Sequence, residues 1–315
     1  MKRFIAISCL MLALSCGKNV PSDGGTAQGE GGGSTPPSED RIDVRIATYN
    51  IRCLQSTDTG YKSWEFRKGN VAKLVKNLGF EIVGFQEVSE GMVADLKNGL
   101  PEYGFHLVGR NDGVSKGESV GVAWKSARFT SVATGRFFLS GTPDEVSSPY
   151  PAWTSTDPGR NRVVAWAVLE DRASGRRLLV FATHFEVGKT DEVTIRLRSA
   201  ELVASRAVSL NPSGLPFVLL GDLNAKPTES SQAELRKTLT DAYSAAEAAG
   251  VREGFKGSFN GHNYEPENYL DNQGLRIDYI YYKGNIDISR YKVADDKYDG
   301  YYPSDHCPVF ADLKL

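Results

Sequence analysis

The sequence predicts an α/β (α+β) fold, a four-layer sandwich in which two mixed β-sheets pack together and helices flank them. Short apolar runs alternate with segments of helical spacing, as in parallel β-α-β units. Other apolar runs follow each other directly across turns such as Ala173-Ser174-Gly175, as in hairpins, which argues against one doubly wound sheet. With 315 residues and 40% hydrophobic content, the chain can bury a core of this size.

The elements of the first half begin with a strand at 43–49 that ends at Asn50. Apolar residues at helical spacing follow, and Gly79 ends that helix. The apolar run at 82–85 predicts a buried strand that carries Glu87 beyond its end. The same patterns predict a helix at 90–100 and strands at 120–124 and 163–169.

The second half brings further polar residues to strand ends. A strand at 178–183 ends at His184, and the buried strand at 216–220 leads into Asp222. Between them, apolar positions from Val193 to Ala207 predict a helix. The remaining elements are a helical region around 229–249, strands at 277–281 and 308–313, and a long loop at 137–157 that we expect to shape a binding site.

The N-terminus has the pattern of an export signal. Met1-Lys2-Arg3 is basic, and the apolar run at 4–14 is too short to span a bilayer as a permanent helix. Cys16 follows the small residue Ser15 and resembles the acylated cysteine of a bacterial lipoprotein, although Ala13 stands where a larger aliphatic residue is usual. An ordinary signal peptide cleaved elsewhere is the alternative, and either reading predicts an exported protein.

Three segments follow from this interpretation. Residues 1–16 are the lipoprotein signal, 17–41 a flexible tether rich in Gly, Ser and Pro, and 42–315 one catalytic domain. The tether lacks apolar periodicity, as expected of a spacer that lifts a domain off a membrane. We therefore expect a lipid-anchored protein of the cell envelope, facing the periplasm or the surface.

Charge and cysteine content narrow the choice of partners. Cleavage after residue 15 removes two of the 37 basic residues and none of the 39 acidic ones, so the formal charge moves from −2 to −4. This is not the basic footprint of a protein that binds polyanionic nucleic acid.

Cys53 and Cys307 remain in the mature chain, and the sequence leaves open whether they pair.

Polar side chains suited to phosphate-ester hydrolysis cluster at the ends of the predicted strands. Carboxylates can hold Mg²⁺ or Mn²⁺, imidazoles can transfer protons, and amides can donate hydrogen bonds to phosphate oxygens. Each residue alone could cap a turn, but so many strand-end coincidences predict one shared polar site. The residues are Asn50, Glu87, Glu118, His184, Asp222, Asn224, Asp278, Asp305 and His306.

Most of these residues lie in short segments that form an ordered series. The segments are Thr48-Tyr49-Asn50-Ile51-Arg52, Gly84-Phe85-Gln86-Glu87-Val88, Thr183-His184-Phe185, Gly221-Asp222-Leu223-Asn224, Ile277-Asp278-Tyr279 and Ser304-Asp305-His306. In this order they resemble the motifs of the endonuclease/exonuclease/phosphatase superfamily, which includes DNase I, sphingomyelinases and inositol polyphosphate phosphatases. The segments Gly109-Arg110-Asn111-Asp112-Gly113 and Gly117-Glu118 also resemble an exported bacterial branch.

The resemblance implies a DNase I-like fold and a hydrolase that depends on Mg²⁺ or Mn²⁺. It makes Glu87 the first metal ligand and Asp305 a second or water-mediated one. His306 would act as general base or phosphate contact, and Asp278 would orient its ring. Asp222 would position the nucleophile or transfer a proton.

The remaining roles concern the substrate and a second imidazole. His184 is similar to the histidine of DNase I-like members, and the resemblance pairs it with Glu118, leaving open which histidine acts as acid and which as base. Asn50 and Asn224 would contact phosphate. Arg162 would clamp it, with Arg160 as a competitor and a surface charge as the alternative reading.

We therefore expect a metal-dependent phosphoesterase that hydrolyses a phosphodiester or phosphomonoester by in-line attack of water, on a small-molecule, lipid or sugar phosphate, and that is a monomer. An extracytoplasmic DNase I-like nuclease is the alternative within the enzyme class. A catalytically inactive binding scaffold is the alternative from another class.

Overall fold

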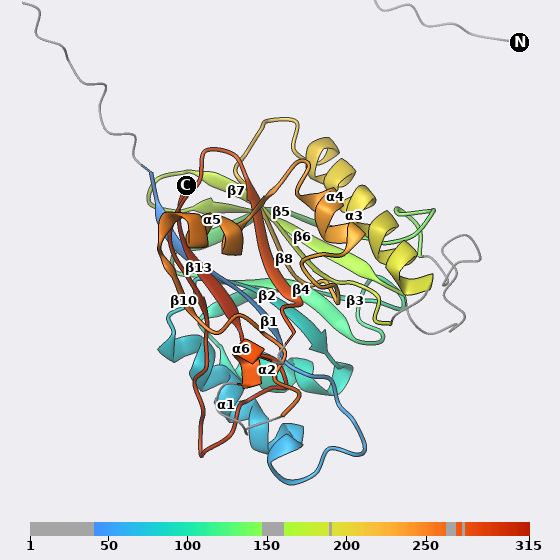
Figure 1. The fold of residues 1–315 in the computed structure, drawn as a ribbon, viewed down its shortest axis with the longest axis vertical. Helices are drawn as coiled ribbons and strands as arrows, with labels where there is room; N and C mark the ends of the chain where they lie inside the picture. The colour runs from blue at the N-terminus through green and yellow to red at the C-terminus, as the bar shows by residue number, and fades with distance from the viewer. Residues whose placement is uncertain (1–40, 147–160, 189–190, 263–268, 273–274) are drawn as a thin grey trace, which may run out of the picture. The chain divides into compact units, whose positions relative to one another are not determined.

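Two β-sheets pack face to face in the computed structural model of the chain (Figure 1). The structure describes residues 41–146, 161–188, 191–262, 269–272 and 275–315. The expected signal with Cys16, the tether up to residue 40, residues 147–157 of the expected loop, and Arg160 lie outside the described residues. No helix in the described ranges is both long and apolar enough to cross a membrane.

The first sheet is built around β1 (Asp43–Asn50). It runs parallel to β2 (Ile82–Val88) and antiparallel to β13 (Val309–Lys314). The sheet is mixed, as the sequence predicts, and its order is β10-β12-β13-β1-β2-β4-β3. Its other strands are β10 (Arg252–Gly254), β12 (Asp287–Val293), β4 (Ser119–Lys125) and β3 (Tyr103–Gly109).

The second sheet is built around β8 (Phe217–Asp222). It runs parallel to β7 (Arg177–His184) and antiparallel to β11 (Asp278–Lys283). Its order is β5-β6-β7-β8-β11-β9. The remaining strands are β5 (Phe129–Phe138), β6 (Val163–Asp171) and β9 (Thr240–Asp241), and the hairpin from β6 to β7 turns at Ala173-Ser174-Gly175.

The core between the sheets follows from the two-residue period of a strand. Ile46 of β1 and Leu220 of β8 point into the same apolar cluster, while the neighbouring Ala47 points to the opposite face. Gly84 of β2 allows the close approach, because a Cβ there would lie 2.6 Å from Leu220 Cβ. The two sheets therefore form the inner layers of the sandwich.

Helices form the outer layers (Figure 1). The first sheet is covered by α1 (Trp64–Asn77) and α2 (Val93–Gly99), whose apolar residues share a cluster with Ala47 and Phe85. The second sheet is covered by α3 (Asp191–Ser209) and α4 (Ser230–Leu235), which pack on Phe181 and Leu219. Shorter elements are η1 (Gly60–Lys62), η2 (Glu90–Met92), α5 (Ala242–Ala249) and α6 (Tyr269–Asn272). The four-layer prediction is confirmed.

The sequence analysis missed β3, β5 and β12 because they are not continuous apolar runs. The middle of β5 is exposed, and the first four residues of β12 are exposed or half-buried, which weakens the apolar signal. β5 also continues to Phe138, so the expectation that the loop begins at residue 137 is wrong. The helical region around 229–249 consists of α4 and α5, with β9 between them.

Candidate active site

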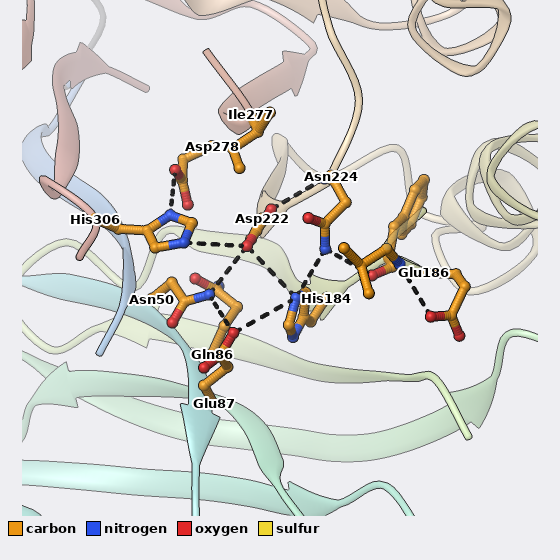
Figure 2. A network of polar contacts seen from close by, with 12 residues as sticks. Asn50, Gln86, Glu87, His184, Glu186, Asp222, Asn224, Ile277, Asp278 and His306 are labelled. Carbon is orange, nitrogen blue, oxygen red and sulfur yellow. Dashed lines mark hydrogen bonds and ion pairs between the residues drawn. The ribbon is translucent and has the colours of Figure 1, made fainter. Parts of the chain in front are cut away.

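The strand register brings the predicted polar residues to one edge of the sandwich. In the second sheet, Asp222 at the end of β8 pairs with His184 of β7 on one side and Asp278 of β11 on the other. In the first sheet, Asn50 at the end of β1 pairs with Gln86 of β2. Because the two sheets face each other, these side chains converge in one buried cluster (Figure 2).

His306 is held by a carboxylate on one side of this cluster. Its Nδ1 lies 2.8 Å from Asp278 Oδ2, which also accepts a 2.6 Å hydrogen bond from Ser258 Oγ. Burial alone would lower the pKa of His306, but the charge and hydrogen bond of Asp278, with Asp222 and Asp305 nearby, hold that pKa well above its ordinary value. The ring is therefore an imidazolium at neutral pH, with Nε2 3.7 Å from Asp222 Oδ2.

Asp222 lies between the two histidines. Its Oδ2 accepts a hydrogen bond from Asn50 Nδ2 at 2.9 Å and lies 3.4 Å from His184 Nε2, while its Oδ1 accepts from the backbone N–H of Asn224. Burial, reinforced by the charge of Asp278, raises the pKa of Asp222 to about 7. A carboxyl group that titrates near neutrality can both accept and release a proton.

His184 differs from His306 in its partners. Its Nε2 lies 2.9 Å from Asn224 Nδ2, which also donates to the carbonyl of Phe185 at 3.0 Å. An amide nitrogen can only donate, so Nε2 of His184 accepts and carries no proton. Burial, followed by the positive charge of Arg162, holds the pKa of His184 well below its ordinary value, which keeps the ring neutral.

Glu87 offers the carboxylate best suited to a metal ion. Its Oε1 accepts from Asn50 Nδ2 at 3.0 Å, its Oε2 accepts from the backbone N–H of Cys53 at 2.8 Å, and each oxygen keeps a free lone pair. Ligand atoms of Glu87, His184 and Asp222 all lie within 4.8 Å of one another. Hard carboxylate oxygens are the donors that Mg²⁺ and Mn²⁺ prefer, so these residues fit the expected ion.

The backbone around this site is strained. Glu87, Arg52 and Asn224 have φ values of 61°, 56° and 47°, in the left-handed region that residues other than glycine seldom adopt. Strain of this kind concentrates at functional sites, where the surrounding structure fixes the conformation. It turns these residues toward the cluster as the strands end.

Asp305 lies in the same cavity but is neutralised by an arginine. Its Oδ2 is 2.5 Å from Arg52 Nη1, and Arg52 also pairs with Asp58 at 2.6 Å. Burial alone would raise the pKa of Asp305, but His306 and Arg52 outweigh it and lower that pKa. Arg52 ends the segment Thr48-Tyr49-Asn50-Ile51-Arg52, but no sequence pattern predicts its pairing with Asp305.

The structure places Glu118 beside an arginine. The resemblance pairs Glu118 with His184, whereas Glu118 Oε2 lies 2.9 Å from Arg110 Nη1. The carboxylates with an oxygen within 4.0 Å of His184 Nε2, among the described residues, are Glu87 and Asp222. Glu118 and His184 nevertheless line one cavity.

Arg162 is buried, so the alternative reading as a surface charge is wrong. Its guanidinium donates to Glu186 at 3.2 and 3.4 Å. The sequence analysis missed Glu186, Arg110 and Ser258, because nothing in their local sequence indicates an ion pair or a contact across the fold. The position of Glu186, two residues after His184, is the one signal that could have identified it.

A cavity of about 470 Å³ opens onto the cluster. This volume lies within the range of roughly 300 to 1,000 Å³ that is typical of small-molecule sites. A more open hollow of about 1150 Å³ lies at Arg41, Lys125 and Asp171, and none of the predicted site residues lines it. The walls of the smaller cavity include the arginines Arg52, Arg110 and Arg162 and the apolar side chains of Phe259, Leu275 and Ile277.

Both cysteines of the described domain are free and buried, so they do not form a disulfide. Cys53 lies in the cavity wall, where Gln55 donates to its Sγ at 3.0 Å. Burial raises the pKa of each thiol to about 12, which keeps both protonated and unreactive.

The sequence profile of the Endonuclease/Exonuclease/phosphatase family matches residues 47–306. No curated protein sequence matches the chain significantly. Among solved structures, an endonuclease/exonuclease/phosphatase from Bacteroides vulgatus is 27% identical, with a TM-score of 0.78 over 87% of this chain and 99% of its own.

Two further structures are similar. A mannosyl-6-phosphatase from Bacteroides thetaiotaomicron is 29% identical, with a TM-score of 0.76 over 86% of this chain and 100% of its own. The human Nocturnin catalytic domain with a bound sulfate anion is 19% identical, with a TM-score of 0.65 over 89% of this chain and 100% of its own, and shares the fold.

Proposed function

The chain belongs to the endonuclease/exonuclease/phosphatase family and is a phosphoesterase, and from this premise we propose that it hydrolyses a phosphate monoester of a small polyhydroxylated molecule, such as a sugar. The observation that carries the proposal is Asp222, a buried carboxyl group between a neutral and a charged imidazole. The small cavity favours a small-molecule ester over duplex DNA, as does the acidic net charge. The similarity to a mannosyl-6-phosphatase supports a sugar phosphate.

Mg²⁺ or Mn²⁺ would be held by Glu87, and Asp305 is the second candidate carboxylate. When bound, such an ion would neutralise charge on the phosphoryl oxygens and polarise the ester. Asn50 holds the Glu87 carboxylate and the neighbouring Asp222 through hydrogen bonds of 3.0 and 2.9 Å.

The proton transfers fall to the chain's own residues. Asp222 orients the attacking water and accepts its proton, which suits a carboxyl group that titrates near neutrality. His306, charged and fixed by Asp278, donates its Nε2 proton toward a phosphoryl oxygen. Because Nε2 lies 3.7 Å from Asp222 Oδ2, both groups act on the side of the attacking water, opposite the leaving oxygen of an in-line displacement.

On the far side of Asp222 from His306, Asn224 and the neutral His184 support Asp222. The two Nδ2 hydrogens of Asn224 are directed at His184 Nε2 and the Phe185 carbonyl, and its backbone N–H donates to Asp222 Oδ1. Arg162, held by Glu186, lines the same cavity and would contact the phosphate as a fixed guanidinium.

A substrate panel with Mg²⁺ or Mn²⁺, with and without EDTA, tests the proposal. The panel contains hexose phosphates, inositol phosphates, sphingomyelin, bis-p-nitrophenyl phosphate, plasmid DNA and RNA, assayed with wild type and His306→Ala in parallel. We expect metal-dependent release of phosphate from hexose phosphates that is lost in His306→Ala. Preferred cleavage of plasmid DNA would establish the nuclease alternative, and the absence of any hydrolysis would establish the inactive scaffold.

We also propose that the protein is exported and anchored through Cys16, and that it acts as a monomer. The basic and apolar segments before Cys16 and the Gly/Ser/Pro-rich segment after it motivate the anchor. Wild type should fractionate with membranes in a bacterial host, and Cys16→Ala should not. Equal membrane association of the two proteins would contradict the anchor, and a dimer mass in light scattering would contradict the monomer.

A further inference from the structure

The loop between β3 and β4 forms a second polar wall of the catalytic cavity. Arg110 and Glu118 face each other at its mouth: the backbone N–H of Arg110 donates to the Glu118 carbonyl at 3.1 Å, and their side chains pair at 2.9 Å. Asn161 and Arg162, just before β6, complete this wall. The residues enclose a recess of about 10 Å³, directly beside His184.

Two polar atoms of this wall have no partner. Arg110 Nε and Asn161 Oδ1 are buried and make no hydrogen bond within the part of the chain that the structure describes. Buried polar atoms are nearly always satisfied, and both residues line the recess beside His184, so a hydroxyl group or a water molecule that enters the recess would complete them. One of these atoms is a donor and the other an acceptor, so the ligand must offer both.

Hydrogen bonds hold the loop in one conformation, which suits it for recognition. Asp112 Oδ1 accepts hydrogen bonds from the backbone N–H groups of Val114, Ser115 and Lys116 at 2.8 to 2.9 Å. Arg136 of β5 fastens the loop by donating from Nε to the carbonyl of Gly113 at 2.9 Å. Arg110 and Glu118 are therefore held in place before a ligand arrives.

The other wall of the cavity is apolar. Phe259, Leu275 and Ile277 line it, and the ring of Phe259 lies 5.0 Å from that of His306. A sugar ring matches both walls, because its C–H face is apolar while its hydroxyl groups donate and accept hydrogen bonds.

We propose that Arg110, Glu118 and Asn161 form a subsite for the hydroxyl groups of the alcohol half of the ester, which makes the substrate a polyhydroxylated phosphate monoester. This inference rests on the proposed function and deepens it. Arg110 donates to a hydroxyl oxygen, Glu118 accepts a hydroxyl proton, and Asn161 Oδ1 accepts a second one. Glu118 then selects the substrate instead of orienting His184.

Kinetics on two substrates separate selection from catalysis. Glu118→Gln and Asn161→Leu should raise KM for a hexose phosphate by about 10- to 100-fold, the size of a lost hydrogen bond to a charged or buried group. With p-nitrophenyl phosphate, which has no hydroxyl groups on its ring, both KM and kcat should stay within about twofold of wild type. Glu65→Gln removes an exposed carboxylate on α1 and is the matched control.

Two outcomes would overturn the subsite. If Glu118→Gln lowers kcat equally on both substrates, Glu118 acts in catalysis and not in substrate selection. If neither variant changes the kinetics on either substrate, these residues do not bind the substrate. Binding of the free hexose, measured by saturation-transfer NMR, does not depend on turnover. Wild type should bind the hexose and Glu118→Gln should not. Equal binding by the two proteins, or no binding by wild type, would overturn the subsite. Failure to hydrolyse any phosphate ester is a different result and would refute only the proposed function.

Discussion

The two histidines on either side of Asp222 are equally buried but differ in charge. His306 is 5% exposed and His184 is 7% exposed, so desolvation opposes the charged form of both. His306 has Asp278 at 2.8 Å on its Nδ1 and is an imidazolium, whereas His184 has an amide on its Nε2 and Arg162 nearby and is neutral. Burial lowers the pKa of both rings; the carboxylate partner of His306 reverses this effect, whereas the charge of Arg162 adds to it at His184. The cluster therefore holds one proton donor and one neutral ring around a single carboxyl group.

Of the variants that distinguish the two histidines, His306→Gln should have the largest effect on kcat. The substitution removes the charged donor while keeping a polar side chain of similar size. We expect kcat to fall by about 10⁴-fold, the upper range for one general acid or base. Steady-state rates on a hexose phosphate, whose leaving oxygen is an alkoxide, measure the fall in kcat, and a variant within tenfold of wild type would exclude His306 as the proton donor.

His184→Gln should lower kcat less than His306→Gln does, because the glutamine side-chain oxygen can accept the hydrogen bond that Asn224 Nδ2 donates to His184 Nε2. We expect a fall in kcat of about 10²-fold, at the lower range of the same effect. The same assay, with circular dichroism to confirm folding, compares the two variants. If His184→Gln is as damaging as His306→Gln, the two rings share the work equally and the asymmetry is wrong.

Asp278→Asn should convert His306 into a ring that resembles His184. Loss of the carboxylate removes the main influence that raises the pKa of His306, so the ring should lose its proton at a lower pH. The alkaline limb of the pH–rate profile should move to lower pH, and the ¹⁵N shifts of His306 in the metal-free protein should change near pH 7 from those of an imidazolium to those of a neutral ring. A profile identical to that of wild type would contradict the role of Asp278.

The smallest effect is expected from Ser258→Ala. Ser258 Oγ donates to Asp278 Oδ2 at 2.6 Å and accepts from the backbone N–H of Asp278 at 3.1 Å, so it positions the carboxylate without touching the substrate. Removing it should lower the free energy of unfolding by about 1 to 3 kcal/mol and kcat by less than about tenfold. Urea titration and steady-state kinetics measure the two quantities, and a loss of kcat as large as that of Asp278→Asn would mean that Ser258 acts directly.

The sequence predicted the partner of His306 but not the partner of His184. The couple of Asp278 and His306 forms as expected, because both residues lie at strand ends whose register the apolar runs determine. The partner of His184 could not be predicted in the same way. Asn224 reaches it only through a left-handed turn after β8, and Glu118 is held by Arg110 across a hairpin whose first strand carries a weak apolar pattern.

The same contrast holds for the fold. Continuous apolar runs predicted β1, β2, β7 and β8, which are buried on both faces. The half-exposed β5 gave no such pattern and was read in part as loop. Ion pairs between distant segments, such as Arg52 with Asp305 and Arg162 with Glu186, depend on how loops cross the edge of the sandwich, which no local pattern encodes.

Asp222→Asn tests the central claim most directly, because Asp222 is the group that both halves of the cluster share. The measurement is kcat for a hexose phosphate at pH 7 with saturating Mg²⁺ or Mn²⁺, with wild type and Glu65→Gln as references. We expect kcat to fall by about 10³- to 10⁴-fold with folding intact, since an amide at this position cannot accept a proton as the carboxyl group of Asp222 does. A variant that retains wild-type turnover would show that the ester is not hydrolysed through this cluster.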